Sequence, residues 1–364
     1  MSLTHTVPIH VVHRLLRTAQ HYGLDMDELL RGTGIAPQLV LNVRARVTTG
    51  QLTQIIRRLW RMSDDELFGL GPSQVPRGTT RLLAMALITS RDVRTLLERF
   101  DEFVRVLPGV PSATVTFGEA QTTLELDTAG LDDPEHLLTD LMLAIAHRMI
   151  GWATGRRIAL LSLELPYPEP PYAADHELIF GQLPRYAAGR AALGLDNTLL
   201  DAPIIRTEDE LIRYLNDSPS GLLSQRDYGS TTADQVRRIL ERGLRGDWPS
   251  SDQVAARLAV SLQHLRRRLR EEGTSISEIR EQILRDAAIA SLVRGEEPVN
   301  DLSGRLGFSE PSAFRRAFRR WTGSPPGAYR PAGSADADAD ADADTDTDAD
   351  TDTDADTGTG TDSG

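Results

Sequence analysis

Two segments in the last third of the chain carry polar side chains at spacings that place them on one face of a helix. The first segment supplies Gln263, Arg266, Arg267 and Arg270, and the second supplies Ser312, Arg315, Arg316 and Arg319. Guanidinium, amide and hydroxyl groups on a helix can hydrogen bond to base edges and phosphates, because the major groove of DNA admits a helix. We therefore expect these residues to form a DNA-binding site.

The residues around the first set predict a helix-turn-helix. Val254, Leu258 and Val260 give one buried face, and the helix breaks at Val260 and Ser261. Ser261 is a favourable N-cap for the helix that follows. The inward positions of that second helix are leucines, namely Leu262, Leu265 and Leu269. A short helix, a tight turn and a polar second helix are typical of this motif.

The same pattern recurs further along the chain. Leu302 and Leu306 point inward, and Gly307 lies at the predicted turn. Ser309 is the predicted N-cap, and Pro311 suits the first turn of the next helix. The core stripe of that helix is aromatic and consists of Phe314, Phe318 and Trp321. The sequence therefore predicts two helix-turn-helix units.

One long helix is predicted between the two units. Residues 276–293 keep a helical period over 18 positions, which corresponds to about 27 Å at a rise of ~1.5 Å per residue. One turn of B-DNA is about 34 Å. A helix of this length can hold two recognition helices in successive major grooves.

The second unit resembles the signature of the AraC/XylS family of transcriptional regulators. The matching positions are Leu302, Leu306, Gly307, Phe308, Ser309, Ser312, Phe314, Arg315, Arg316, Phe318, Arg319, Gly323, Pro326, Tyr329 and Arg330. Ser303 departs from the usual alanine. The arginine cluster at 266–268 is richer than usual, which leaves the division between base and phosphate contacts open. The resemblance implies a sequence-specific regulator that activates transcription through RNA polymerase.

The part of the chain before these units is predicted to be an effector domain. Residues 8–107 have a helical period, and residues 108–225 are mixed, with a hairpin from 112–117 and 122–127, a helix at 137–151 and strands near 158–165 and 192–200. The segment from Gly23 to Ile35 resembles a family branch that lacks the jelly-roll domain. The expected fold is mainly α with a small α+β portion, comprising an effector domain at 1–225 and an all-α DNA-binding domain at 231–330.

The charge distribution supports this division. The net charge is −13, but Asp occupies every even position from 336 to 356, and the basic residues are all arginine. Residues 231–330 hold 18 Arg against 13 Asp and Glu, a net charge of +5, as expected for a surface that meets phosphate. We expect residues 331–364 to be a disordered acidic tail that aids solubility, or alternatively one that competes weakly with DNA for the arginine-rich face.

Other chemistry has little support in the sequence. The absence of cysteine excludes disulfides and thiolate zinc sites. His176 and Glu177 begin like a zinc-protease helix, but the second histidine is missing, so no metal is expected. His147 is interpreted as a core histidine rather than an effector contact, and Trp152, Met142, Met149 and Phe103 are interpreted as core residues rather than pocket lining. No cofactor and no catalytic residue are predicted.

The leading hypothesis is a cytoplasmic, effector-responsive regulator that binds double-stranded DNA and a small molecule of unknown identity. A homodimer is possible, and no membrane partner is expected, because the apolar segment 137–152 is interrupted by Asp140, His147 and Arg148. One alternative is an enzyme-like N-terminal domain with a DNA-binding module attached, which a convergent acid–base pair in a pocket would favour. Another is architectural DNA binding without a ligand.

Overall fold

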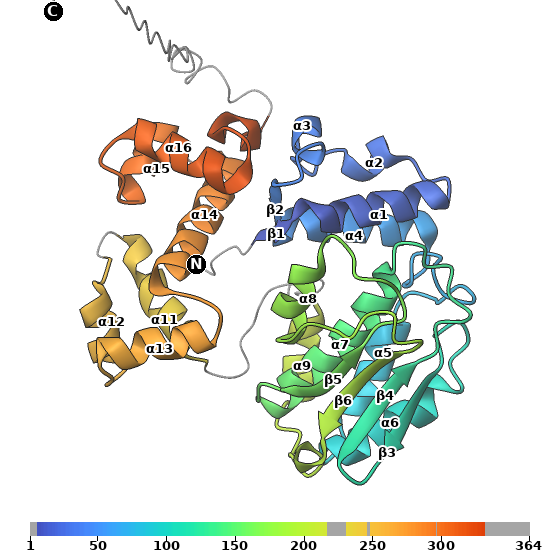
Figure 1. Ribbon diagram of the computed structural model, residues 1–364. Coiled ribbons are helices and arrows are strands. Elements are labelled where there is room, and N and C mark those ends of the chain that lie inside the picture. The colour runs from blue at the N-terminus through green and yellow to red at the C-terminus, as the bar shows by residue number, and fades with distance from the viewer. Residues whose placement is uncertain (1–5, 217–230, 246–247, 296, 332–364) are drawn as a thin grey trace, which may run out of the picture.

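A computed structural model describes residues 6–216, 231–245, 248–295 and 297–331 (Figure 1). Helices dominate these residues, and the strands form one two-stranded and one four-stranded sheet. The fold class predicted from the sequence is therefore confirmed. The proposed tail falls outside the described residues from position 332 onward, and so does most of the segment expected to link the two domains.

The N-terminal helices pack around a pair of very short strands. The elements are β1 (Thr6–Pro8), α1 (Ile9–His21), α2 (Met26–Leu30), α3 (Pro37–Val40), β2 (Arg46–Thr48) and α4 (Thr49–Ser63). Asp25 caps α2, and Thr48 forms a capping box with Gln51 at the start of α4. The sequence predicted a helical region here, within residues 8–107, but not β1 and β2, because three residues are too few to show an alternating pattern.

The middle of the chain forms the mixed lobe, which is residues 79–216. Its elements are α5 (Thr79–Ile88), α6 (Val93–Val104), β3 (Ala113–Phe117), β4 (Gln121–Leu126), α7 (Leu137–Thr154), β5 (Leu160–Glu164), α8 (Ala173–Phe180), β6 (Ala191–Asp196), a 3-10 turn η1 (Asn197–Leu199) and α9 (Glu208–Asn216). The strands are antiparallel in the order β3-β4-β6-β5. The predicted hairpin and the strand near 158–165 are confirmed, whereas the strand near 192–200 ends earlier, at Asp196.

The C-terminal part is helical throughout its described residues. It consists of α11 (Thr232–Glu241), η2 (Arg242–Arg245), α12 (Ser251–Arg257), α13 (Leu262–Glu271), α14 (Ile276–Arg294), α15 (Val299–Arg305), α16 (Pro311–Thr322) and η3 (Pro326–Tyr329). We refer to α12 with α13 as the first unit and to α15 with α16 as the second unit. Ser275 caps α14, whose bounds match the predicted helix within one residue.

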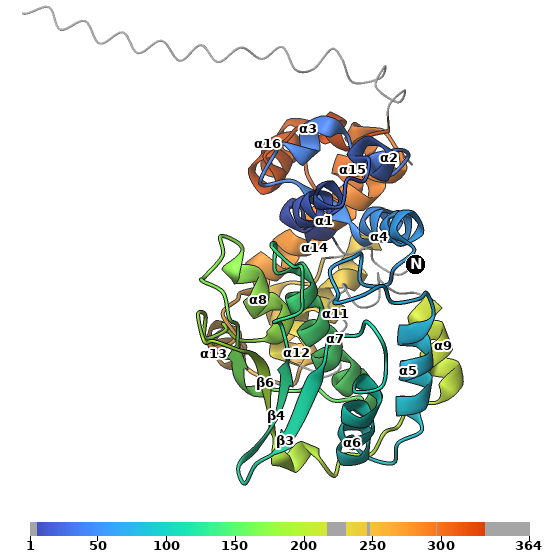
Figure 2. The same cartoon turned by 90° about the vertical axis from the view of Figure 1, so that its right-hand side faces the viewer.

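The two units differ in what their apolar residues pack against. The first unit shares a small core with α11 and the start of α14, which includes Val254, Leu265 and Ile279. The second unit instead completes the core of the N-terminal helices, because Leu292 and Phe318 belong to the same buried cluster as residues of α1 and α4. Figure 1 shows α14 beside β1 and β2, and in the view of Figure 2 α15 and α16 lie behind α1 and α3.

Hydrogen bonds reinforce this shared core. Thr6 Oγ1 donates to Asp286 Oδ1 at 2.6 Å, and the backbone N–H of Arg46 donates to Tyr329 Oη at 3.2 Å. The Nδ2 group of Asn42 donates to the carbonyl oxygen of Thr322 at 3.0 Å and to Ser324 Oγ at 2.6 Å. The second unit is thereby fastened to the N-terminal helices.

Candidate nucleic-acid interface

The first unit is defined by its caps and its turn. Ser250 and Gln253 form a capping box at the start of α12, and Ser261 Oγ accepts a hydrogen bond from the backbone N–H of His264 at 3.2 Å. The predicted cap at Ser261 is therefore confirmed. The helix ends before Ala259, whose φ of 55° lies in the left-handed region. After this turn the chain changes direction, and α13 packs against α12.

The second unit has the same turn with a different start to its second helix. Gly307 occupies the left-handed position with a φ of 86°. The predicted N-cap at Ser309 is wrong, because α16 begins at Pro311 and Glu310 precedes it in an extended conformation without a side-chain cap. A proline disfavours helical angles in the residue before it, so the chain stays extended through Glu310.

The two turns are closed by equivalent hydrogen bonds. In the first unit the N–H groups of Ala259 and Val260 donate to the carbonyl oxygens of Ala256 and Ala255, each at 3.1 Å. In the second unit Gly307 donates to Gly304 at 3.0 Å, and Phe308 donates to Ser303 at 3.1 Å. The repeat seen in the sequence is thus also a repeat of backbone geometry.

Most of the predicted DNA-binding residues are exposed on the two second helices. The exposed ones are Gln263, Arg266, Arg267 and Arg270 on α13, and Ser312, Arg316 and Arg319 on α16. Arg315 is half-buried and donates to Asn300 Oδ1 at 3.3 Å. Arg267 lies 3.7 Å from the carboxylate of Glu271 in an exposed ion pair. The assignment of these side chains to DNA remains a prediction.

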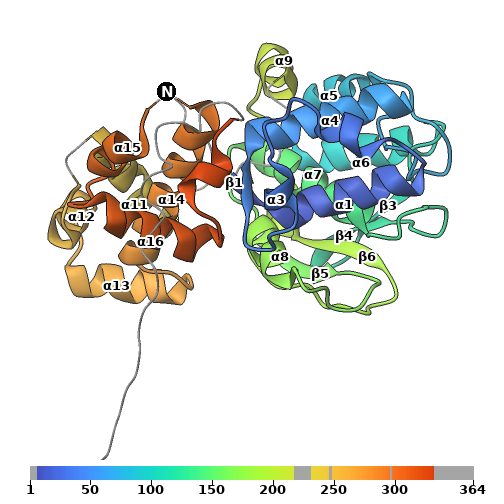
Figure 3. The same cartoon turned by 90° about the horizontal axis from the view of Figure 1, so that it is seen from above.

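The linking helix sets the distance between the two units. Figure 1 shows them at opposite ends of α14, and Figure 3 shows α13 and α16 on the same side of it. At 19 residues, α14 is about 28 Å long, which is close to one turn of DNA. Trp248 lies between the units, with the guanidinium of Arg280 4.7 Å from its ring centre.

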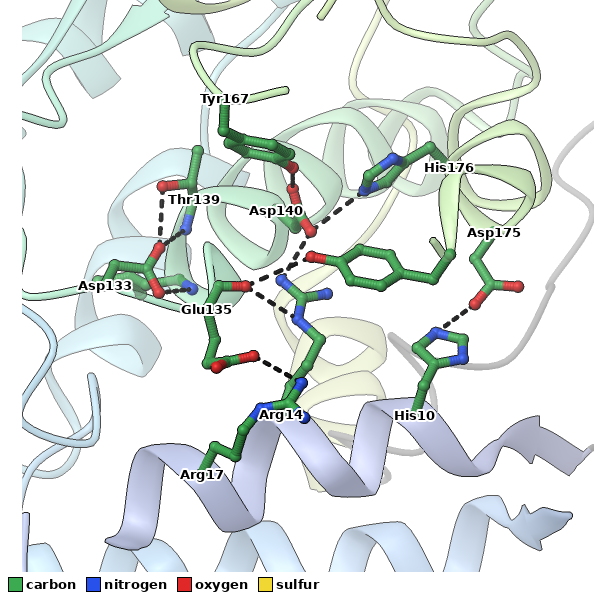
Figure 4. A network of polar contacts seen from close by, with 12 residues as sticks. His10, Arg14, Arg17, Asp133, Glu135, Thr139, Asp140, Tyr167, Asp175 and His176 are labelled. Atoms are coloured by element: carbon green, nitrogen blue, oxygen red, sulfur yellow. Dashed lines mark hydrogen bonds and ion pairs between the residues drawn. The ribbon is translucent and has the colours of Figure 1, made fainter. Parts of the chain in front are cut away.

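A buried polar network joins α1 to the mixed lobe (Figure 4). Asp140 of α7 lies at its centre and is 5% exposed, while Arg14 is 6% and His176 is 1% exposed. Arg14 Nη2 donates to Asp140 Oδ2 at 2.7 Å, and His176 Nε2 donates to the same oxygen at 3.2 Å. Tyr167 Oη donates to Asp140 Oδ1. Each oxygen of this carboxylate is therefore paired.

Aromatic rings surround the Arg14 side chain. Its guanidinium carbon lies 4.6 Å from the centre of the Tyr172 ring, and His10 stacks on the same ring at 5.2 Å. Burial opposes ionisation of Asp140, but the hydrogen bond from His176 and the charge of Arg14 outweigh it and lower the pKa of Asp140. Burial also raises the pKa of Tyr172 to about 12. The network is thus a buried ion pair surrounded by aromatic side chains.

Sequence reasoning did not find this network. His176 was considered only as a metal ligand, and no group of residues able to hold a metal occurs in the described part of the chain. Arg14 and Asp140 lie 126 positions apart, so no local spacing connects them. The available signal was a carboxylate within the otherwise apolar helix α7.

The residues interpreted as core have mixed outcomes. Trp152 is buried and stacks on Tyr214 at 4.6 Å, and Met142 and Met149 pack against the buried cores, as predicted. Phe103 is instead 37% exposed, because it lies on the outer side of α6. His147 donates from Nε2 to the carbonyl oxygen of Ile158 at 2.8 Å, but its ring also borders a cavity.

Comparison with known proteins identifies two regions. Residues 23–204, half of the chain, match the family model described as the arabinose-binding N-terminal domain of the AraC transcription regulator. Residues 254–332 match a helix-turn-helix domain. None of the described helices is long and apolar enough to cross a membrane.

Relatives agree along nearly the whole chain. The ornithine utilization regulator of Pseudomonas aeruginosa is 22% identical over 328 residues, covering 90% of this chain and 96% of the relative. The regulator VqsM of the same species is 41% identical over 76 residues, covering 21% of this chain and 23% of VqsM. A solved structure of the regulator CdpR, also from P. aeruginosa, aligns over 89% of this chain and 98% of its own, with 20% identity and a TM-score of 0.27. The ornithine utilization regulator and VqsM are transcriptional regulators, and so is the protein whose N-terminal domain model matches half of this chain. The alternative of an enzyme is therefore set aside, and the chain belongs to the AraC family of DNA-binding transcriptional regulators.

Proposed function

We propose that this regulator inserts α13 and α16 into successive major grooves of an operator and that a small-molecule effector controls this binding. The observation that carries the proposal is the pair of equivalent turns at Ala259 and Gly307, joined by one rigid helix of suitable length. The helices α13 and α16, which carry the exposed arginines, lie on the same side of α14 (Figure 3).

The DNA contacts are assigned to the predicted residues with one distinction. Gln263, Arg266, Arg267 and Arg270, together with Ser312, Arg316 and Arg319, are exposed enough to reach base edges or phosphates directly. Arg315 is already hydrogen bonded to Asn300, so we assign it to holding α15 against α16 and contacting the backbone. The corresponding division of the chain is an effector domain at 1–225, a DNA-binding domain at 231–330 and a tail at 331–364.

The effector is proposed to be a small metabolite. A relative named for ornithine utilization and a family model described as arabinose-binding both support this class. Activation through RNA polymerase, self-association as a homodimer and action in the cytoplasm are further parts of the proposal. They are supported by the family to which the chain belongs.

The test is to map binding sites across the genome and then titrate a recovered duplex with Arg267→Ala and Arg316→Ala variants. A lost base contact weakens binding by about 1 to 3 kcal/mol and relaxes specificity at one position. A lost phosphate contact weakens all sequences alike and lowers the salt slope by about one. Arg81→Ala is the control, because Arg81 is exposed on α5. Equal affinities for all four proteins would refute the proposed interface.

A further inference from the structure

A cavity of about 610 Å³ separates the mixed lobe from the first unit. One wall consists of the C-terminal part of α7, the segment after it and α8, which contribute His147, Arg148, Gly151, Arg156, Arg157 and Phe180 among others. The opposite wall is formed by α11, the end of α13 and α14, with Arg237, Arg270 and Gln282. Its volume falls within the range of ~300–1,000 Å³ found for small-molecule sites.

The charged groups around this cavity favour an anion. It is lined by five arginines, Arg148, Arg156, Arg157, Arg237 and Arg270, and by four acids, Glu177, Asp234, Glu271 and Glu272. Among the described residues, Arg156, Arg157 and Arg270 form no ion pair. Guanidinium groups recognise carboxylates by paired hydrogen bonds.

Three of the four acids already accept hydrogen bonds or form an ion pair within the protein. Glu272 accepts hydrogen bonds from the backbone N–H groups of Thr232 and Ala233 at 2.9 and 2.8 Å, so its charge lies at the N-terminus of α11. Asp234 accepts from the N–H of Thr231 at 3.1 Å, as part of the capping box of the same helix. Glu271 pairs with Arg267. Glu177 is the remaining lining acid, against three described lining arginines that form no ion pair, Arg156, Arg157 and Arg270.

Apolar side chains complete the lining. Ile179 is half-buried and lines the cavity, together with the edges of the largely buried side chains of Ile158, Phe180 and Ile279. They give a ligand a small apolar surface between the two charged walls. This combination suits a small organic molecule that carries a carboxylate on a hydrocarbon body.

The position of the cavity gives such a ligand a means of acting on DNA binding. The second unit is fastened to the N-terminal helices by a shared core and by the hydrogen bonds of Thr6 and Asn42. The first unit has its own core and faces the mixed lobe across the cavity. A molecule bound to both walls would fix the first unit relative to the second.

We propose that this cavity is an effector site for a small organic carboxylate, held by Arg156 and Arg157 from the mixed lobe and by Arg237 of α11, which packs in the core of the first unit. This inference rests on the proposed function, since it names the effector class and the place where the effector acts. Bound carboxylate sets the spacing of α13 from α16 and thereby the affinity for the operator.

The test uses the full-length chain and a panel of straight-chain mono- and dicarboxylates, from butanoate to decanoate and from succinate to azelate. The corresponding alcohols, which are uncharged, and the corresponding amines, which are cationic, serve as controls for the charge of the head group. Thermal unfolding identifies binders, calorimetry measures their Kd, and titration of a mapped duplex measures DNA affinity. The variants are Arg156→Glu and Arg157→Glu, with Arg81→Glu as a charge-matched control away from the cavity.

At least one carboxylate should raise the Tm while its alcohol and amine do not. Its Kd should weaken by about tenfold or more in each cavity variant, as expected when a charged hydrogen bond is lost, and should not change in Arg81→Glu. The carboxylate should also alter the operator affinity of the wild type but not of the two cavity variants, whose affinity without ligand stays normal.

The inference is overturned if no carboxylate binds, if amines bind instead, or if the cavity variants bind carboxylates as tightly as the wild type. A wild-type protein that binds its mapped duplex but no carboxylate would refute this site and leave the proposed function intact. A wild-type protein that fails to bind any mapped duplex would refute the proposed function itself.

Discussion

A carboxylate buried inside an apolar helix is costly unless both of its oxygens are paired. Asp140 meets this condition because Arg14 of α1 and His176 of α8 donate to its Oδ2 atom and Tyr167 donates to its Oδ1 atom, all from distant parts of the chain. The sequence shows the unusual carboxylate in α7 but not its partners. At the residue scale, therefore, sequence reasoning identified the exposed arginines and missed the buried ion pair.

Replacing Arg14 by methionine should lower the free energy of unfolding by about 3 to 5 kcal/mol, because it leaves the charge of Asp140 buried without its cationic partner. Chemical denaturation of the full chain measures the change. Arg17→Met is the matched control, since Arg17 pairs with Glu135 but is 53% exposed at its side chain; it should cost less than about 1 kcal/mol. Similar losses for both variants would contradict the importance of the buried pair.

At the scale of helices and strands, the sequence predicted most elements well. Residues 276–293 were expected as a helix, and α14 follows these bounds closely, since Ser275 caps its start and Gly295 ends it in a left-handed conformation. The predicted helix break at Val260 and Ser261 is confirmed, because both residues lie between α12 and α13, but the residue with the left-handed conformation is Ala259. Alanine carries no sign of a left-handed conformation, so nothing in the sequence marked Ala259 as the turn residue.

The left-handed φ of Ala259 makes a specific prediction about this turn. Ala259→Gly should stabilise the chain by about 0.5 to 1 kcal/mol, because relief of backbone strain exceeds the added entropy of the unfolded state. Ala256→Gly, at an exposed helical position of α12, should instead destabilise by about 0.5 to 1 kcal/mol. Thermal unfolding compares the two. If both variants lose stability, the turn at Ala259 is not strained.

At the scale of the whole molecule, the sequence does not show which distant segments pack against each other. Helical periodicity in residues 8–62 and in residues 299–322 shows that each has an apolar face, but not which partner covers it. The structure places both faces in one core. The division into an effector domain and a DNA-binding domain therefore cuts through a cluster of buried side chains around Leu292 and Phe318.

A fragment of residues 231–331 should still fold, because the first unit has its own core and the rings of Phe314, Phe318 and Tyr329 pack on one another at 5.3–5.7 Å. Its second unit should be less stable than in the full chain. Hydrogen exchange should show faster exchange of α16 amides in the fragment and unchanged exchange of α13 amides. An equal change in both helices would count against the asymmetry between the units.

The shared core also determines the order in which the protein can be completed during synthesis. The residues from Ile9 to Val75 leave the ribosome before those from Leu284 to Tyr329. At about 5 to 20 residues per second, roughly 10 to 40 seconds separate Val75 from Leu284. During that interval the nascent N-terminal helices lack part of their apolar cover. A chain that terminates before α14 consequently leaves this apolar surface exposed to other proteins, and the shared core closes only after Tyr329 has been added.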